Sequence, residues 1–287
     1  MSKIPEEYKS QIQATKNGVS RRPPQQFRPL IGLSFLLILA IMALLASDFA
    51  VSKSRAESLK KENEAPKTAS PVARPEIQWQ MRHNYIVNQR VRTGSYDLLI
   101  LGDSITQGMN LKILQKYFGM RVEAFGIGGD RTQNLLWRIQ HGEIDFRKQA
   151  QPKTVVVLIG TNNLVFWPDS PPSTPSEIAE GVAANIKEIR KRLPASQILA
   201  LGLLPRAEDP KSPLRAQIIE TNTLLKKLQD HKHIFYADLG AKFLDPSGKI
   251  KAELMPDFLH PGFEAGNELL ISELKAAVDS IKPKQKN

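Results

Sequence analysis

Five short apolar runs, each followed by turn residues, recur along the chain after residue 76. They lie at 98–101, 122–125, 154–159, 197–204 and 233–237, and stretches with helical spacing of apolar positions separate them at 111–117, 132–140, 175–193 and 213–229, with a last one at 262–281. Strands buried on both faces read as continuous apolar runs, and alternating strands and helices build parallel sheets. The pattern predicts an α/β domain over 76–287, with a doubly wound, five-stranded, mostly parallel sheet and helices on both faces.

A different pattern occupies the N-terminal part of the chain, where residues 30–47 form an 18-residue run without a charge. As a helix this run would span roughly 27 Å, close to the hydrocarbon thickness of a bilayer. Six basic residues precede it, and the first charge that follows is Asp48. The positive-inside rule therefore predicts a cytoplasmic basic tail over 1–29, a transmembrane signal-anchor helix over 30–47, and a periplasmic or extracellular remainder.

Two other interpretations of the apolar run remain open. A cleaved signal peptide would use the same run, with Ala43, Ala46 and Ala50 near its end, and would release a secreted protein; the long leading region favours an uncleaved anchor. A buried core helix is disfavoured, because the run is apolar all round and a charged stretch follows it. That stretch, 48–75, is rich in Ala, Pro, Ser and charge, and it predicts a flexible linker.

Charge and composition exclude some function classes. The net charge of +11 is concentrated at the N-terminus, where residues 1–75 carry 12 Lys and Arg against six Asp and Glu. No helix-turn-helix, zinc or single-strand-binding signature accompanies the charge, so we expect no nucleic-acid partner. The chain has no cysteine, which excludes disulfides, thiolate metal sites and a cysteine nucleophile.

Four loops carry residues suited to chemistry, and a parallel sheet would bring them to one edge. The sequences GDSIT (102–106), GIGGD (126–130) and GTNN (160–163) each follow an apolar run, and DFLHP (257–261) precedes the last helical stretch. Ligands of open α/β sheets bind at the carboxyl ends of the strands. The four loops therefore predict one site at that edge.

Ser104, Asp257 and His260 are the residue types of a nucleophile, an orienting acid and a general base. A serine at a strand-to-helix turn is exposed, and the helix N-terminus favours developing negative charge. Asp257 and His260 are three residues apart, so one short turn would bring carboxylate and imidazole together. The alternatives are that Ser104 caps a helix and that Asp257 and His260 form a surface ion pair.

Gly129 and Asn162 are candidate donors to an oxyanion, together with the backbone N–H of Ser104. A backbone N–H at a glycine-rich turn and an amide side chain both suit this role. The alternative is that GIGGD is only a tight turn and that Asn162 caps its own backbone.

Taken together, the four blocks resemble the SGNH (GDSL) hydrolases, which are named for a Ser, a Gly, an Asn and a His drawn from such blocks. In detail, the segments 125–143, 155–163 and 201–206 are similar to the catalytic α subunits of intracellular platelet-activating-factor acetylhydrolase. The resemblance covers residues 77–281 and implies an SGNH, flavodoxin-like fold. It implies Ser104 as nucleophile, Gly129 and Asn162 as oxyanion donors, and Asp257 with His260 as the rest of a triad.

The sequence departs from those subunits in two places. They lack the anchor and linker expected here, and the segment LVFWP (164–168) replaces a more polar stretch. Because this segment follows Asn162, we hypothesise that Phe166 and Trp167 line the substrate entrance or touch the bilayer surface. The alternative is that they cover the core of their own domain.

The predicted function is that of a membrane-anchored serine esterase that needs no metal or organic cofactor. Its expected substrates are short acyl or acetyl esters of lipids, lysophospholipids among them, or of glycans. An acyl-glycan binding protein and an O-acyltransferase on the same scaffold remain alternatives. The sequence does not fix the oligomeric state.

Overall fold

The computed structural model describes residues 52–53 and 66–281 of the chain. The expected transmembrane span at 30–47, the tail before it and most of the expected linker lie outside the described residues and remain predictions. Within the described residues, no helix combines the length and the apolar character needed to cross a membrane.

The core of the domain is a five-stranded sheet in which every described strand pair is parallel. The strands are β1 (Leu98–Gly102), β2 (Val122–Gly126), β3 (Thr154–Leu158), β4 (Gln197–Leu201) and β5 (Ile234–Ala237), in the spatial order β2-β1-β3-β4-β5. The predicted doubly wound α/β sheet is thus confirmed, and it is wholly rather than mostly parallel. The chain first adds β2 on one side of β1 and then β3 on the other, so the strand order reverses at β1, where such sheets place their ligands.

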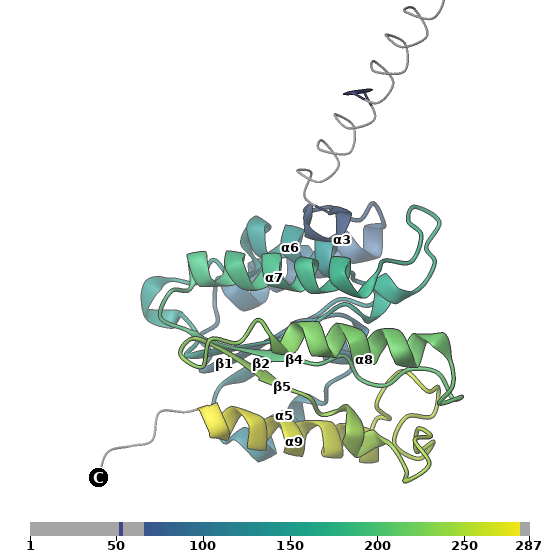
Figure 1. Ribbon diagram of the computed structural model, residues 1–287. Coiled ribbons are helices and arrows are strands. Elements are labelled where there is room, and N and C mark those ends of the chain that lie inside the picture. Colours follow the sequence, from purple (N-terminus) through teal and green to yellow (C-terminus); the bar gives the residue numbers. More distant parts are fainter. Residues whose placement is uncertain (1–51, 54–65, 282–287) are drawn as a thin grey trace, which may run out of the picture. The chain divides into compact units, whose positions relative to one another are not determined.

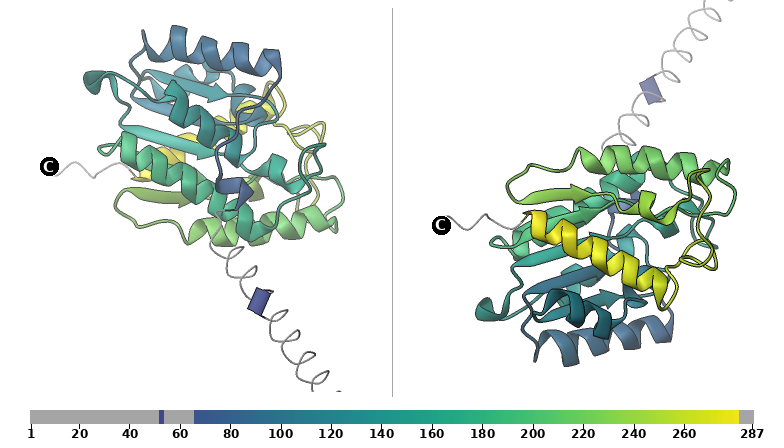
Figure 2. Two further views of the ribbon diagram at one scale, coloured as in Figure 1. Left: turned by 90° about the horizontal axis from the view of Figure 1, so that it is seen from above. Right: turned by 90° about the horizontal axis from the view of Figure 1, so that it is seen from below.

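Helices cover both faces of this sheet (Figures 1 and 2). The α-helices are α3 (Ile77–Tyr85), α4 (Ser104–Gln107), α5 (Leu111–Phe118), α6 (Thr132–Arg138), α7 (Pro175–Arg192), α8 (Pro213–Lys226) and α9 (Ala265–Ile281). Helices α6 and α7 lie on one face, and α5 and α9 lie on the other. The shorter elements are η1 (Lys67–Ala69), η2 (Ile86–Val91), η3 (Ile139–Glu143), η4 (Lys148–Ala150), η5 (Thr161–Leu164) and η6 (Gly240–Phe243).

Alternate residues of each strand pack into two separate apolar cores. Leu99, Leu101 and Val157 face the core on the α7 side, whereas Leu98 and Ile100 face the core on the α9 side. All five residues of β1 are buried, as are all five of β3. Because successive side chains of a strand point to opposite faces, a strand buried on both faces needs an unbroken apolar run.

Local signals set the ends of the helices. Helix α7 begins with a capping box between Thr174 and Glu177 and has Pro175 in its first turn. Helix α5 begins after Asn110, whose side chain accepts from two backbone N–H groups, and ends at Gly119 in the left-handed conformation. The predicted helix over 132–140 keeps regular geometry only to Arg138, after which a wider turn leads into a left-handed Gly142.

The folded domain begins about ten residues before the boundary at 76 that the sequence suggests. Thr68 is buried, its hydroxyl donates to the carbonyl of Glu177 at 2.6 Å, and its own carbonyl accepts from Thr132 at 2.8 Å. Val72 exchanges two further hydrogen bonds with the start of α6. Residues 66–75 are therefore a strap packed on the domain, which corrects the expectation of a flexible linker for this part of 48–75. Helix α3 is a second element that the sequence pattern missed.

Candidate active site

Ser104, His260 and Asp257 form a continuous hydrogen-bonded chain at the carboxyl end of the sheet. Ser104 Oγ lies 2.8 Å from His260 Nε2, and His260 Nδ1 lies 2.6 Å from Asp257 Oδ2. The other carboxylate oxygen of Asp257 accepts from the backbone N–H groups of Leu259 at 3.0 Å and His260 at 2.7 Å. The structure thus brings together all three residues that the sequence singled out, although 156 positions separate Ser104 from His260.

Ser104 is the first residue of α4, and Asp103 rather than Ser104 caps that helix. Asp103 Oδ1 accepts from the backbone N–H of Ile105 at 2.9 Å. The alternative interpretation, in which Ser104 caps the helix, is therefore wrong. Since its hydroxyl is not used to cap the helix, Ser104 can present it to the imidazole.

Asp103 is an unusual neighbour for the serine because its carboxyl is almost completely buried. Burial raises its pKa to about 7, and the charge of Asp130 adds to this effect; the hydrogen bond from Ile105 and the charge of Arg138 oppose it. A group that titrates near neutral pH therefore lies next to Ser104 in the chain.

The loop that carries Asp257 and His260 is held in a strained conformation. Phe258 lies between the two and has a φ of 55°, and Ala207, after β4, has a φ of 73°. The backbone N–H of Ala207 donates to the carbonyl of Phe258 at 3.0 Å and so ties the two left-handed residues together. Non-glycine residues adopt this conformation only where surrounding contacts impose it.

The pKa of Asp257 favours a charged carboxylate beside the imidazole. Partial burial acts to raise this pKa, but the backbone N–H and side chain of His260, together with the Leu259 N–H, outweigh that effect and lower it. A charged Asp257 accepts a hydrogen bond from the Nδ1–H of His260, which leaves Nε2 as the acceptor toward Ser104.

The two expected oxyanion residues lie in neighbouring loops that are bonded to each other. The side-chain amide of Asn162 donates to the carbonyl of Asp130 at 3.0 Å, and thereby ties η5 to the residue after Gly129. A Cβ built on Gly128 would lie 3.8 Å from Ser104 Cβ, so the glycine loop runs beside the serine. Within the described residues, the backbone N–H groups of Ser104 and Gly129 have no acceptor. Such donors suit an oxyanion.

Gly129 needs to be glycine for two separate reasons. Its φ is +78°, a conformation that L side chains rarely adopt. In addition, an added Cβ would lie 2.8 Å from Arg74 Nη1 and 3.2 Å from Trp167 Cη2. The backbone at this position is therefore tightly enclosed.

Phe166 and Trp167 lie in different environments. Phe166 is 72% exposed, whereas Trp167 is half-buried and donates its indole N–H to the carbonyl of Asn162 at 2.8 Å. The guanidinium groups of Arg74 and Arg131 lie over the Trp167 ring, 5.7 and 5.5 Å from its centroid. Trp167 thus packs against its own domain beside Asn162 and Gly129, and it also lines a cavity of about 230 Å³ with residues 72–76 and Gly129.

Arg138 is a structural centre of the site that the sequence analysis missed. Its side chain is completely buried and donates to the carboxylates of Asp130 and Glu143 at 2.6–2.8 Å. It also donates to the carbonyls of Gly102 at 3.0 Å and Phe125 at 2.7 Å, at the carboxyl ends of β1 and β2. Arg138 thereby joins the strands before Ser104 and Gly129 to the aspartate after Gly129.

The strap also reaches the glycine-rich loop at 126–130. Arg74 Nη1 donates to the carbonyl of Gly128 at 2.8 Å and lies 3.6 Å from a carboxylate oxygen of Asp130. Trp79, from α3, donates its indole N–H to the same carboxylate at 2.6 Å. No local sequence signal marks these two contacts, because both join segments that are more than 50 positions apart.

Comparison with known proteins agrees with this geometry. Residues 100–268 match the model of the GDSL-like Lipase/Acylhydrolase family. The chain is 36% identical over 199 residues to platelet-activating factor acetylhydrolase IB subunit alpha2 of Rattus norvegicus, which covers 67% of this chain and 82% of that protein. It is 31% identical over 183 residues to the human alpha1 subunit, and this alignment covers 63% of this chain and 74% of that protein.

Solved structures share the fold at lower identity. An acetyl xylan esterase has a TM-score of 0.53 at 22% identity, covering 63% of this chain and 99% of that chain. A GDSL-like lipase from Bacteroides thetaiotaomicron has a TM-score of 0.52 at 18% identity, covering 64% of this chain and 88% of that chain. The family match and the curated relatives, rather than these likenesses, identify the chain: it belongs to the GDSL-like lipase/acylhydrolase (SGNH) family and is a carboxylic ester hydrolase.

Proposed function

We propose that this chain is a membrane-anchored serine esterase that removes short acyl groups, acetyl foremost, from lipids or glycans. His260 takes the proton of the Ser104 hydroxyl as Oγ attacks the ester carbonyl. The alcohol leaves with that proton, and water, activated by the same imidazole, then releases the acid and restores Ser104. Asp257 holds the imidazole in the required tautomer.

The single observation that carries this proposal is the contact of 2.8 Å between Ser104 Oγ and His260 Nε2, with Asp257 behind the ring at 2.6 Å. A general base within hydrogen-bond reach of a hydroxyl, oriented by a third group, is the arrangement that activates a serine. The backbone N–H groups of Ser104 and Gly129 and the amide of Asn162 serve as donors to the oxyanion.

The acyl preference rests on what related proteins are named for. The curated relatives are acetylhydrolases, and one structural neighbour is an acetyl xylan esterase. A small acyl group is the chemistry common to these proteins, whereas their alcohol parts differ. We therefore propose an acetyl or similarly short acyl group and leave both lipid and glycan as its carrier.

The cellular location is proposed from the sequence. The uncharged run at 30–47 and the six basic residues before it support an anchor with the N-terminus in the cytoplasm and the catalytic domain outside. Release by cleavage near Ala46 would give a smaller, secreted form. Fractionation of cells, with the size of the membrane-bound protein measured, separates these two cases.

The test of the esterase uses the full chain in a neutral detergent with p-nitrophenyl acetate as substrate. We expect Ser104→Ala to lower kcat by about a thousandfold or more, and we expect organophosphorus reagents to label the native protein and not this variant. Ser280→Ala, on the exposed end of α9, is the matched control and should hydrolyse normally. Normal hydrolysis by Ser104→Ala would overturn the proposal, and turnover only with an added sugar acceptor would show a transferase.

A further inference from the structure

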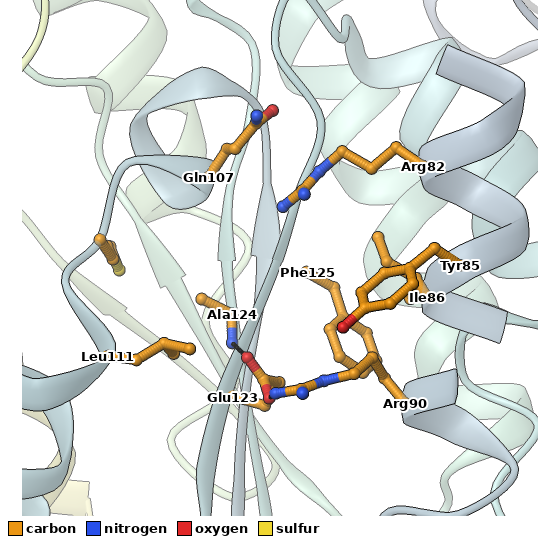
Figure 3. Close-up of a pocket in the computed structure, with 10 residues that line it drawn as sticks. Arg82, Tyr85, Ile86, Arg90, Gln107, Leu111, Glu123, Ala124 and Phe125 are labelled. Atoms are coloured by element: carbon orange, nitrogen blue, oxygen red, sulfur yellow. Dashed lines mark hydrogen bonds and ion pairs between the residues drawn. The ribbon is translucent and has the colours of Figure 1, made fainter. Parts of the chain in front are cut away.

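A cavity of about 210 Å³ lies beside the edge strand β2, on the side away from β1 (Figure 3). Helix α3 and its continuation η2 form one wall, and the end of α4 with the start of α5 forms the other. None of its residues belongs to the triad or donates to the expected oxyanion. The lining comprises Arg82, Tyr85, Ile86, Arg90, Gln107, Met109, Leu111, Glu123, Ala124 and Phe125.

The charges in this cavity do not cancel. Arg90 forms an ion pair with Glu123, a buried acid on β2. Arg82 donates its Nε–H to the carbonyl of Gly126 at 2.7 Å, and no carboxylate lies within 4.0 Å of its guanidinium among the described residues. With one acid and two arginines, the cavity keeps one uncompensated positive charge.

That positive charge is partly withdrawn from water. Burial lowers the pKa of Arg82, and the nearby charge of Arg138 lowers it further, while Glu143 opposes the shift. An arginine nevertheless stays protonated at any physiological pH. A bound anion would therefore compensate for the lost hydration of Arg82 and for its repulsion by the guanidinium of Arg138.

Gln107 connects this cavity to the nucleophile. Its Oε1 accepts from the backbone N–H of Gly128 at 2.7 Å, and its Nε2 has no acceptor within the described residues. Ser104 and Gln107 are three residues apart on α4 and so share one face of the helix. Figure 3 shows Gln107 and Arg82 at the same end of the cavity, extending from opposite walls.

We propose that this cavity is a subsite for an anionic group, a phosphate or a carboxylate, carried by the ester that Ser104 attacks. This proposal rests on the proposed esterase function and narrows its substrate class. The Arg82 guanidinium and the Gln107 amide donate to the anion at the end nearest Ser104. Tyr85 and Leu111, which line the cavity and are exposed, provide apolar surface for the carbon skeleton that joins the anion to the ester.

The catalytic test compares three soluble acetyl esters on the full chain in a neutral detergent: acetylglycerol, acetylglycerol 3-phosphate and acetylated glucuronate. We expect kcat/KM to be about tenfold higher for at least one anionic ester than for acetylglycerol. Arg82→Gln should reduce that preference to about one, and Arg82→Lys should keep part of it. Arg92→Gln, an exposed arginine beyond η2, is the control and should keep the native preference.

A binding test decides the same question without turnover. Glycerol 3-phosphate and glucuronate are titrated by calorimetry into the native protein and into the Arg82 and Arg92 variants. We expect at least one anion to bind the native protein and Arg92→Gln, and to bind Arg82→Gln about tenfold more weakly; which anion binds tells phosphate from carboxylate. Thermal unfolding of each variant checks that the fold is kept.

The outcomes separate this inference from the esterase proposal. If p-nitrophenyl acetate is not hydrolysed by the native protein, the esterase proposal fails, and the calorimetry still decides whether the cavity takes an anion. If esters are hydrolysed but neither anion binds, or if Arg82→Gln binds and discriminates like the native protein, the anion subsite is overturned while the esterase stands.

Discussion

Replacing Arg138 by Met is the substitution with the largest effect that the structure predicts away from the triad. The side chain is completely buried, and its guanidinium donates to two buried carboxylates, Asp130 and Glu143, and to two strand carbonyls. Methionine has a similar length and no donors, so the change removes the partner without opening a large cavity. Of the basic groups in contact with them among the described residues, Asp130 would then keep only the more distant Arg74 guanidinium, at 3.6 Å, and Glu143 only the imidazole of His83, at 2.9 Å.

The magnitude follows from that loss. Removing one partner of a buried ion pair costs about 3–5 kcal/mol, because an uncompensated charge remains. The total stability of a domain is only about 5–15 kcal/mol, so Arg138→Met should be near the limit of folding. We also expect lower esterase activity in the variant, since Arg138 joins the strands that precede Ser104 and Gly129 to Asp130.

The loss of unfolding free energy in Arg138→Met should depend on pH in a definite direction. Burial acts to raise the pKa of both carboxyls. Arg138, together with His83, outweighs this effect at Glu143, whose pKa is lowered, whereas at Asp130 the charge of Arg138 only limits the rise. Removing Arg138 removes the largest contribution that lowers each pKa, so both carboxyl pKa values should rise, and the variant should lose stability relative to the native protein as the pH rises from about 4. The deficit relative to the native protein should therefore be smaller at pH 5 than at pH 8.

Urea unfolding followed by circular dichroism at these two pH values measures the deficit. Arg92→Met, at an exposed position, is the control and should change the unfolding free energy by less than about 0.5 kcal/mol. Adding Glu143→Gln to Arg138→Met should recover part of the loss, because it removes one orphaned charge. A deficit below about 1 kcal/mol at both pH values would refute the account of Arg138 as the cation that two buried acids require.

Two further predictions concern Asp103 and the strap. Since burial raises the pKa of Asp103 to about 7, its contribution to stability falls as the pH rises from about 4 to 7. The Asp103→Asn variant should therefore match the native melting temperature near pH 4 and exceed it at pH 8. An equal difference in melting temperature between variant and native protein at both pH values would contradict this. A chain that starts at residue 76 loses the strap and its hydrogen bonds to the domain, each worth about 0.5–1.5 kcal/mol. It should melt at a lower temperature and hydrolyse p-nitrophenyl acetate more slowly than a chain that starts at 66, and identical behaviour of the two chains would show that the strap contributes nothing.

The fold and the contact of Ser104, His260 and Asp257 were predictable because their signals are local or follow from topology. The central strand β1 is an unbroken apolar run at 98–101, since both of its faces are buried. Asp257 and His260 are close in sequence, so their pairing needs only one turn. Ser104 and Asn162 follow strands that are adjacent in the sheet, and parallel pairing brings such residues to one edge.

The supporting contacts were not predictable, because the residues involved give misleading local signals. Helix α3 buries Trp79 and His83 but leaves Ile77, Met81 and Tyr85 largely exposed, so its apolar positions show no single face. The strap reads as linker because Pro, Ala and charge dominate it, although the domain supplies its hydrogen-bond partners. Arg138 looks like a surface residue in sequence, and only the fold supplies the two acids that permit its burial.

The backbone hydrogen bond between Ala207 and Phe258 has a consequence for how the enzyme meets its substrate. Each of these left-handed residues costs about 1–3 kcal/mol, and the folded domain bears that cost whether or not an ester is present. The imidazole is consequently in place before the encounter, and little freedom is left to freeze when the complex forms. A small acetyl ester, which can make few contacts with the protein, can then react without first having to order the imidazole.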